Sequence, residues 1–109
     1  MNFENRWSER QHVRLRITLF DEGREVLQAN CRDLSFGGIF IDTDARPLDI
    51  DKKLEIAFSL RSAAGSQQYR LPARVVRNHR GGAALAFSDY DIKTLNALRA
   101  LLYDGTSSN

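Results

Sequence analysis

Alternating apolar and polar residues divide most of the chain into short segments with the period of a half-buried β-strand. The clearest alternation places Leu54, Ile56, Phe58 and Leu60 between polar or small residues. We expect further strands in residues 15–19, 24–34, 39–41, 69–76 and 83–87. Six short strands at regular spacing are typical of a small closed or nearly closed antiparallel barrel.

Turn residues separate these segments. Hairpin or loop connections are expected at 21–23, 42–51, 62–67 and 78–82, where glycine, proline, asparagine, serine or aspartate gather. The loop at 42–51 contains Pro47 and four acidic residues, which we interpret as solvated. Pro72 lies inside a predicted strand and indicates an edge strand or a bulge, because proline lacks the N–H that a strand ladder uses.

A helical period replaces the strand period near the C-terminus, where apolar positions recur at Ile92, Leu95, Leu98 or Arg99, and Leu102. Ser88 is the predicted N-cap, with two aspartates in the first turn, and Gly105 is the predicted end. The predicted fold class is all-β with one helix, a six-stranded antiparallel barrel followed by a C-terminal α-helix. Residues 10–105 would form this domain, after a flexible arm at 1–9 and before a frayed tail at 106–109.

The strand at 24–34 contains a conflict. Asp33 and Ser35 share the phase of Ala29 and Cys31, which would point all four side chains inward. A buried carboxylate destabilises the fold unless it is paired. We therefore predict a bulge or twist near Arg32 that turns Asp33 and Ser35 outward.

Composition narrows the function. The net charge is only +2, which argues against a nucleic-acid binder driven by bulk charge, so no nucleic-acid partner is expected. Of the 16 cationic residues 13 are arginines, whose planar fork suits phosphate and the O6 and N7 atoms of guanine. No apolar run approaches transmembrane length and no secretory signal is visible, so we expect a cytoplasmic protein without membrane insertion.

Catalytic and metal-binding patterns are absent from the sequence. Its two histidines and the single cysteine Cys31 have no metal-ligand spacing, and one cysteine permits no internal disulfide. Ser35 lies in no GxSxG turn, and the glycine pair that follows lacks Walker or Rossmann spacing. We expect no enzyme, no metal and no cofactor.

Two polar clusters form the candidate site. Arg10 and Arg14 match RxxxR, and Asp33, Ser35 and Gly38 match DxSxxG, just before an apolar strand. Each motif is common alone, but both in this order in a chain of this size resemble the PilZ domain family, small bacterial receptors for cyclic di-GMP. The resemblance covers nearly the whole chain.

The resemblance implies that these five residues bind cyclic di-GMP. Arginine would pair with guanine or phosphate and Asp33 with the N–H groups of a base, while Ser35 and the glycine amides would serve phosphate or base oxygen. Glu9 stands where many members carry a basic residue, which favours one nucleotide over a stacked pair. The late strand carries alanine, in the run 84–87, where a glycine is common.

Family resemblance further implies an adaptor that changes its N-terminal arm on binding and signals to an unidentified protein partner in motility, biofilm or polysaccharide control. Two alternatives remain open. One is a PilZ-like interaction module that no longer binds nucleotide. The other is a small RNA- or single-strand-binding barrel, which would place aromatic residues among basic ones along its strands; here most aromatic residues lie at predicted core positions.

Overall fold

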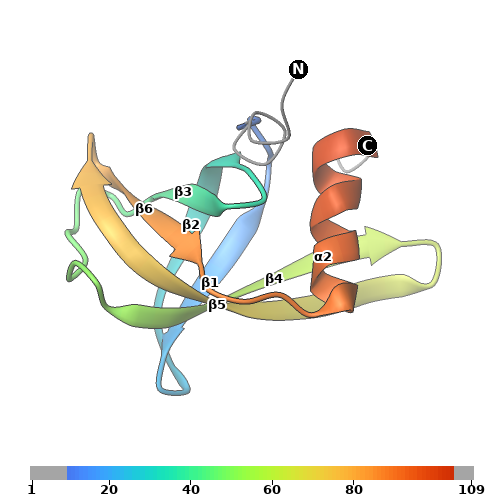
Figure 1. Ribbon diagram of the computed structural model, residues 1–109, viewed down its shortest axis with the longest axis horizontal. Coiled ribbons are helices and arrows are strands. Elements are labelled where there is room, and N and C mark those ends of the chain that lie inside the picture. Colours follow the sequence, from blue (N-terminus) through green and yellow to red (C-terminus); the bar gives the residue numbers. More distant parts are fainter. Residues whose placement is uncertain (1–9, 105–109) are drawn as a thin grey trace.

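The computed structural model describes residues 10–104, and within them six antiparallel strands close into a barrel in the order β1-β2-β3-β6-β5-β4 (Figure 1). The strands are β1 (Arg16–Asp21), β2 (Arg24–Leu34), β3 (Gly38–Asp42), β4 (Lys53–Ser62), β5 (Gly65–His79) and β6 (Gly82–Phe87). Helix α2 (Ile92–Arg99) follows and continues into a π-helical turn over Ala100–Asp104. The predicted fold class is confirmed. The expected arm, the helix end at Gly105 and the tail lie outside the described residues.

The barrel interior is filled by the inward row of each strand. Ile17 and Leu19 of β1, Ile41 of β3 and Ile56 of β4 are each at most 1% exposed. Burial of such a side chain stabilises the folded state by about 1.5–3 kcal/mol. The alternation read from the sequence is therefore the alternation between the barrel core and its outer surface.

The hairpin between β4 and β5 is longer than expected. We predicted a turn over residues 62–67, but Ser62 pairs with Gly65 and the strands turn over two residues. Figure 1 shows this hairpin projecting past α2. The tip of the hairpin carries polar residues on both faces, so the sequence there shows no alternation of apolar and polar residues. Backbone hydrogen bonds alone extend the strand pairing to the tip.

The prediction for Pro72 was wrong. The register shift of β5 falls between Val75 and Arg77, and β5 lies between β4 and β6 in the closed barrel. The carbonyl of Pro72 accepts a hydrogen bond from the N–H of Ser88, 2.9 Å away and one residue beyond the end of β6. In an antiparallel strand the nitrogen and the carbonyl of one residue face the same neighbouring strand. The nitrogen of Pro72 therefore also faces the segment just beyond the end of β6, so the missing N–H removes no hydrogen bond from the β5–β6 ladder.

Helix α2 begins later than predicted. The side chain of Asp91, not Ser88, is the N-cap and accepts a hydrogen bond from the N–H of Thr94 at 2.7 Å. These hydrogen bonds from Thr94 hold the pKa of Asp91 below its ordinary value. Ile92, predicted to face the barrel, is 74% exposed, because it lies on the opposite side of the helix from the buried residues Ala97 and Leu98.

The buried face of the C-terminal segment consists of Thr94, Ala97, Leu98, Leu101 and Leu102. Leu98, Leu101 and Leu102 belong to the same apolar cluster as the barrel interior, which confirms that the helix packs on the barrel. No helix within residues 10–104 is long and apolar enough to cross a membrane.

Candidate functional site

The segment before β1 lies along the end of β2. Gln11 and Leu34 exchange two backbone hydrogen bonds of 2.9 Å, and the N–H of Cys31 donates to the carbonyl of Leu15 at 2.8 Å. These bonds hold the segment that carries Arg10 and Arg14 beside the strand that carries Asp33. Residues separated by about twenty positions in sequence are thereby brought to one flank of the barrel.

The predicted bulge near Arg32 is present. The register between β2 and β3 shifts between Cys31 and Asp33, so that Asp33 pairs with Phe40. Ile39 and Ile41 on either side of Phe40 belong to the core, and alternation therefore directs Phe40 outward. Asp33 shares this outer face, and its side chain is 27% exposed. The bulge thus resolves the conflict for the carboxylate.

Ser35 does not turn outward as expected. It is only 1% exposed, and its hydroxyl oxygen accepts hydrogen bonds from the N–H groups of Gly37 and Gly38, both at 3.2 Å. The N–H of Ser35 also donates to the carbonyl of Gly38 at 2.9 Å. A serine that bonds the backbone two and three residues ahead closes its own turn. Ser35 can be buried because its hydroxyl is satisfied by the backbone N–H groups of this turn.

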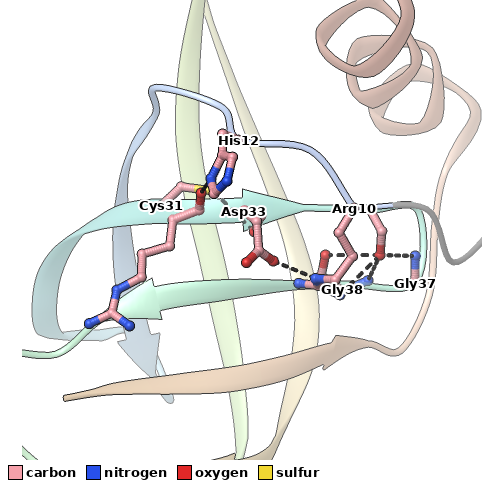
Figure 2. Close-up of polar contacts among 8 residues, drawn as sticks. Arg10, His12, Cys31, Asp33, Gly37 and Gly38 are labelled. Atoms are coloured by element: carbon pink, nitrogen blue, oxygen red, sulfur yellow. Dashed lines mark hydrogen bonds and ion pairs between the residues drawn. The ribbon is translucent and has the colours of Figure 1, made fainter. Parts of the chain in front are cut away.

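Arg10 joins the two motifs. Its Nε pairs with Oδ1 of Asp33, and its Nη1 donates to the hydroxyl of Ser35 at 3.3 Å (Figure 2). Figure 2 shows the side chains of Arg10 and Asp33 pointing toward one another from the pre-barrel segment and from β2. The Arg10 side chain remains 43% exposed, so the pair is accessible from solvent.

The structure therefore brings together four of the five predicted residues. Arg10, Asp33 and Ser35 are in direct contact, and Gly38 joins them through its hydrogen bond to Ser35. Arg14 lies four residues after Arg10 on the same segment, is exposed, and has no side-chain hydrogen bond or ion pair with a described residue.

A family model for the PilZ domain matches residues 4–104. The chain belongs to the PilZ domain family. PilZ domains are regulatory binding modules, and the family is one of cyclic di-GMP receptors. The crystal structure of a PilZ domain of CeSA from a cellulose-synthesizing bacterium shares the fold, with a TM-score of 0.67 and 19% identity over 89% of this chain and 97% of that chain. No curated protein matches this chain.

Two residues next to the motifs, Arg32 and His12, make contacts that the sequence did not predict. Arg32 donates from Nε to Oδ1 of Asp42 at 2.7 Å, and its guanidinium lies 5.1 Å from the centroid of the Phe40 ring. His12 places Nδ1 3.1 Å from the carbonyl oxygen of Arg32, where a protonated Nδ1 donates. The only sequence feature that could have pointed to Arg32 was its position at the predicted bulge, because a bulge changes the direction of a side chain.

Cys31 is a buried free cysteine next to the candidate site. Burial raises the pKa of its thiol to about 12, and the nearby charge of Asp33 adds to the rise while Arg10 opposes it. Because the thiolate is the reactive form, Cys31 acts as a small core side chain. Within residues 10–104 no three histidine, cysteine or acidic side chains gather as ligands for a metal ion.

Proposed function

We propose that this chain is a cyclic di-GMP receptor that binds its ligand through Arg10, Arg14, Asp33, Ser35 and Gly38. The observation that carries the proposal is the contact of Arg10 with both Asp33 and Ser35 at a glycine turn. This contact orients one guanidinium before any ligand arrives, which reduces the entropy lost on binding. The PilZ membership of the chain supplies the ligand class.

Each residue has a role suited to its surroundings. Arg10 keeps Nη2 for the ligand, because Nε and Nη1 already bond to Asp33 and Ser35. Asp33 keeps its second oxygen, which can accept N–H groups of guanine. Arg14 offers a whole guanidinium to guanine or phosphate. The buried hydroxyl of Ser35 bonds to Arg10 and to the glycine turn. Ser35 would therefore increase the affinity by positioning Arg10, and not by touching the ligand.

Regulation would follow from the place of the arginines. Arg10 directly follows residues 1–9 and Arg14 lies four residues further on, so a nucleotide held by both would order the preceding arm against the barrel. We expect amides of residues 1–9 to exchange quickly in the free protein and to gain protection with cyclic di-GMP, while the barrel strands change little. Hydrogen exchange followed by mass spectrometry measures both. Arm amides that are already protected without ligand would contradict this mechanism.

The ordered arm and the nucleotide would present a new surface to a protein partner. We propose that the chain acts in the bacterial cytoplasm as such an adaptor, without enzymatic activity, in motility, biofilm or polysaccharide control. The adaptor role rests on the family and on the exposed position of Arg10 and Arg14.

Base selectivity tests the proposed receptor function. Guanine presents O6 and N7 to an arginine and N1–H and N2–H₂ to a carboxylate, whereas adenine places a donor at the O6 position and lacks both donors. Each good bidentate contact contributes about 1–3 kcal/mol of discrimination. We expect cyclic di-GMP to bind roughly a hundredfold more tightly than cyclic di-AMP in calorimetric titrations, and Asp33→Ala to narrow the difference.

Asp49→Ala is the matched control, because Asp49 is an exposed aspartate in the loop before β4 and lies away from the two motifs. This variant should keep the selectivity of the unmodified chain. Equal affinity for the two cyclic dinucleotides would mean that the site recognises phosphate alone. Failure to bind either nucleotide would favour a PilZ module that serves protein partners only.

A further inference from the structure

A cavity lies outside the two PilZ motifs, between the loop that follows β3 and the turn that joins β5 to β6. Its volume is about 280 Å³, and Arg46, His79 and Arg80 contribute to its lining. No acidic side chain lines it. The lining residues therefore include two arginines and a histidine, which come from two segments far apart in the sequence.

Hydrogen bonds hold the walls of this cavity in place. The N–H groups of Thr43 and Ala45 both donate to the carbonyl of Gly81, at 3.1 and 3.2 Å. The side-chain amide of Asn78 donates to the carbonyl of Leu48 and accepts from its N–H, both at 2.9 Å. The loop and the turn are thus fastened to each other at two points, and the cavity does not depend on a mobile segment to form.

Two non-glycine residues that line the cavity have a left-handed backbone conformation. Ala45 in the loop has φ of 64°, and Arg80 in the turn has φ of 50°, a left-handed conformation that branched or long side chains rarely adopt. Gly81, with φ of 78°, completes a two-residue turn whose first position usually carries asparagine, aspartate or glycine. Glu22 and Gly23 form the same kind of turn between β1 and β2, with φ of 51° and 84°, so the left-handed conformation of Arg80 follows from the hairpin geometry.

The charge of the cavity is not balanced within the protein. Arg10, Arg32, Arg70 and Arg74 each form an ion pair with an acidic side chain. The side chains of Arg46 and Arg80 form no ion pair with any residue in the range 10–104.

A neighbouring cavity of about 500 Å³ shares Arg46 but is also lined by Asp42 and Asp44. Its mixed charge disfavours an anion there. Asp42 is moreover paired with Arg32. Of the two cavities, the smaller one therefore has the stronger attraction for a negatively charged group.

We propose that the smaller cavity is an anion site for a phosphate monoester, separate from the cyclic di-GMP site. A phosphate monoester carries a charge of about −1.5 to −2 at neutral pH and three terminal oxygens. Arginine forks match phosphate oxygens two at a time, and a ring nitrogen of His79 adds a further donor. The volume accommodates a phosphate with a small organic group attached. A small-molecule metabolite of this class is the expected ligand.

The proposal is tested by titrating the full chain with inorganic phosphate and with glycerol 3-phosphate while backbone amide signals are recorded by NMR. We expect saturable shifts of the Arg80, Gly81 and Gly82 amides, and none with chloride at matched ionic strength. Tighter binding of glycerol 3-phosphate than of inorganic phosphate would support a monoester. Shifts that do not saturate, or that chloride reproduces, would overturn the site.

Arg46→Gln and Arg80→Asn should each weaken phosphate binding by at least about tenfold, since each removes a charged donor. Asparagine tolerates the left-handed conformation better than arginine, so Arg80→Asn should keep or raise the melting temperature. The loss of binding can then not be attributed to unfolding. Arg61→Gln, at an exposed arginine on the distant hairpin, is the matched control and should bind phosphate normally.

Measuring cyclic di-GMP binding by the same variants distinguishes the anion site from the proposed receptor function. Arg46→Gln should bind cyclic di-GMP as the unmodified chain does, and Arg10→Ala should bind phosphate normally. A loss of cyclic di-GMP binding in Arg46→Gln would make the cavity part of the nucleotide site and would overturn a separate anion site. A chain that binds no cyclic di-GMP, but shows the saturable phosphate shifts, would retain the anion site alone.

Discussion

Arg10→Ala and Arg14→Ala are each expected to weaken cyclic di-GMP binding by about tenfold to hundredfold. Hydrogen bonds to charged groups contribute about 1.5–3 kcal/mol each, and these side chains provide the charged donors of the proposed site. Stability should change little, because Arg14 is exposed and the Arg10–Asp33 pair is partly exposed, where ion pairs contribute weakly. Calorimetric titration measures the affinity, and thermal unfolding confirms that each variant is folded.

Arg24→Ala provides the matched control, since Arg24 is an exposed arginine at the start of β2, next to the hairpin turn and at the opposite end of the strand from Asp33. It removes one positive charge, as the test variants do, but touches neither motif. A similar loss of affinity in Arg24→Ala would show that only net charge matters. Normal affinity in both Arg10→Ala and Arg14→Ala would contradict the proposed site.

Gly38→Ala is expected to destabilise the fold by at least about 3 kcal/mol, the upper end of typical overpacking. A Cβ atom at Gly38 would lie 2.4 Å from the carbonyl oxygen of Leu85 and 3.3 Å from Cα of Ala86. Both atoms belong to the backbone of β6, which pairs with β3 and cannot move aside as a side chain would. Urea denaturation measures the change in the free energy of unfolding.

Gly23→Ala is the control that measures the loss of stability caused by backbone conformation alone, without steric crowding. Gly23 has φ of 84°, but a Cβ atom there would meet no atom within 4 Å. Its cost should be about 1–2 kcal/mol, from the left-handed conformation alone. An equal or smaller loss for Gly38→Ala would show that β6 can shift, and the glycine of the DxSxxG motif would then be explained by ligand access rather than by packing.

Strand positions were predictable where one face of a strand is buried. Leu54, Ile56 and Phe58 alternate with polar residues because the barrel interior selects apolar side chains at every second position. The tip of the β4–β5 hairpin has no buried face, so its strands left no such pattern. The helix start was misplaced because serine and aspartate are both good N-cap residues. The backbone N–H of Ser88 still bonds to the carbonyl of Pro72 in β5, and the helix begins only after Asp91.

The candidate site was predictable as a set of residues but not as an arrangement. The phase of Asp33 relative to Cys31 was enough to predict the bulge at Arg32, since the alternative was an unpaired buried carboxylate. The same reasoning failed for Ser35, because a hydroxyl can be buried when backbone N–H groups satisfy it. Nothing in the sequence indicated that Arg10 would bridge Asp33 and Ser35.

The sequence by itself determined the barrel class, the hairpin at Glu22 and Gly23, and the two motifs, because each depends on spacing between residues close along the chain. The tertiary structure decided which distant side chains meet. Barrel closure and the pairing of Gln11 with Leu34 bring Arg10 to Asp33, and the loop after β3 brings Arg46 beside Arg80. Such contacts depend on the register and twist of the whole sheet, and no local pattern of residues encodes them.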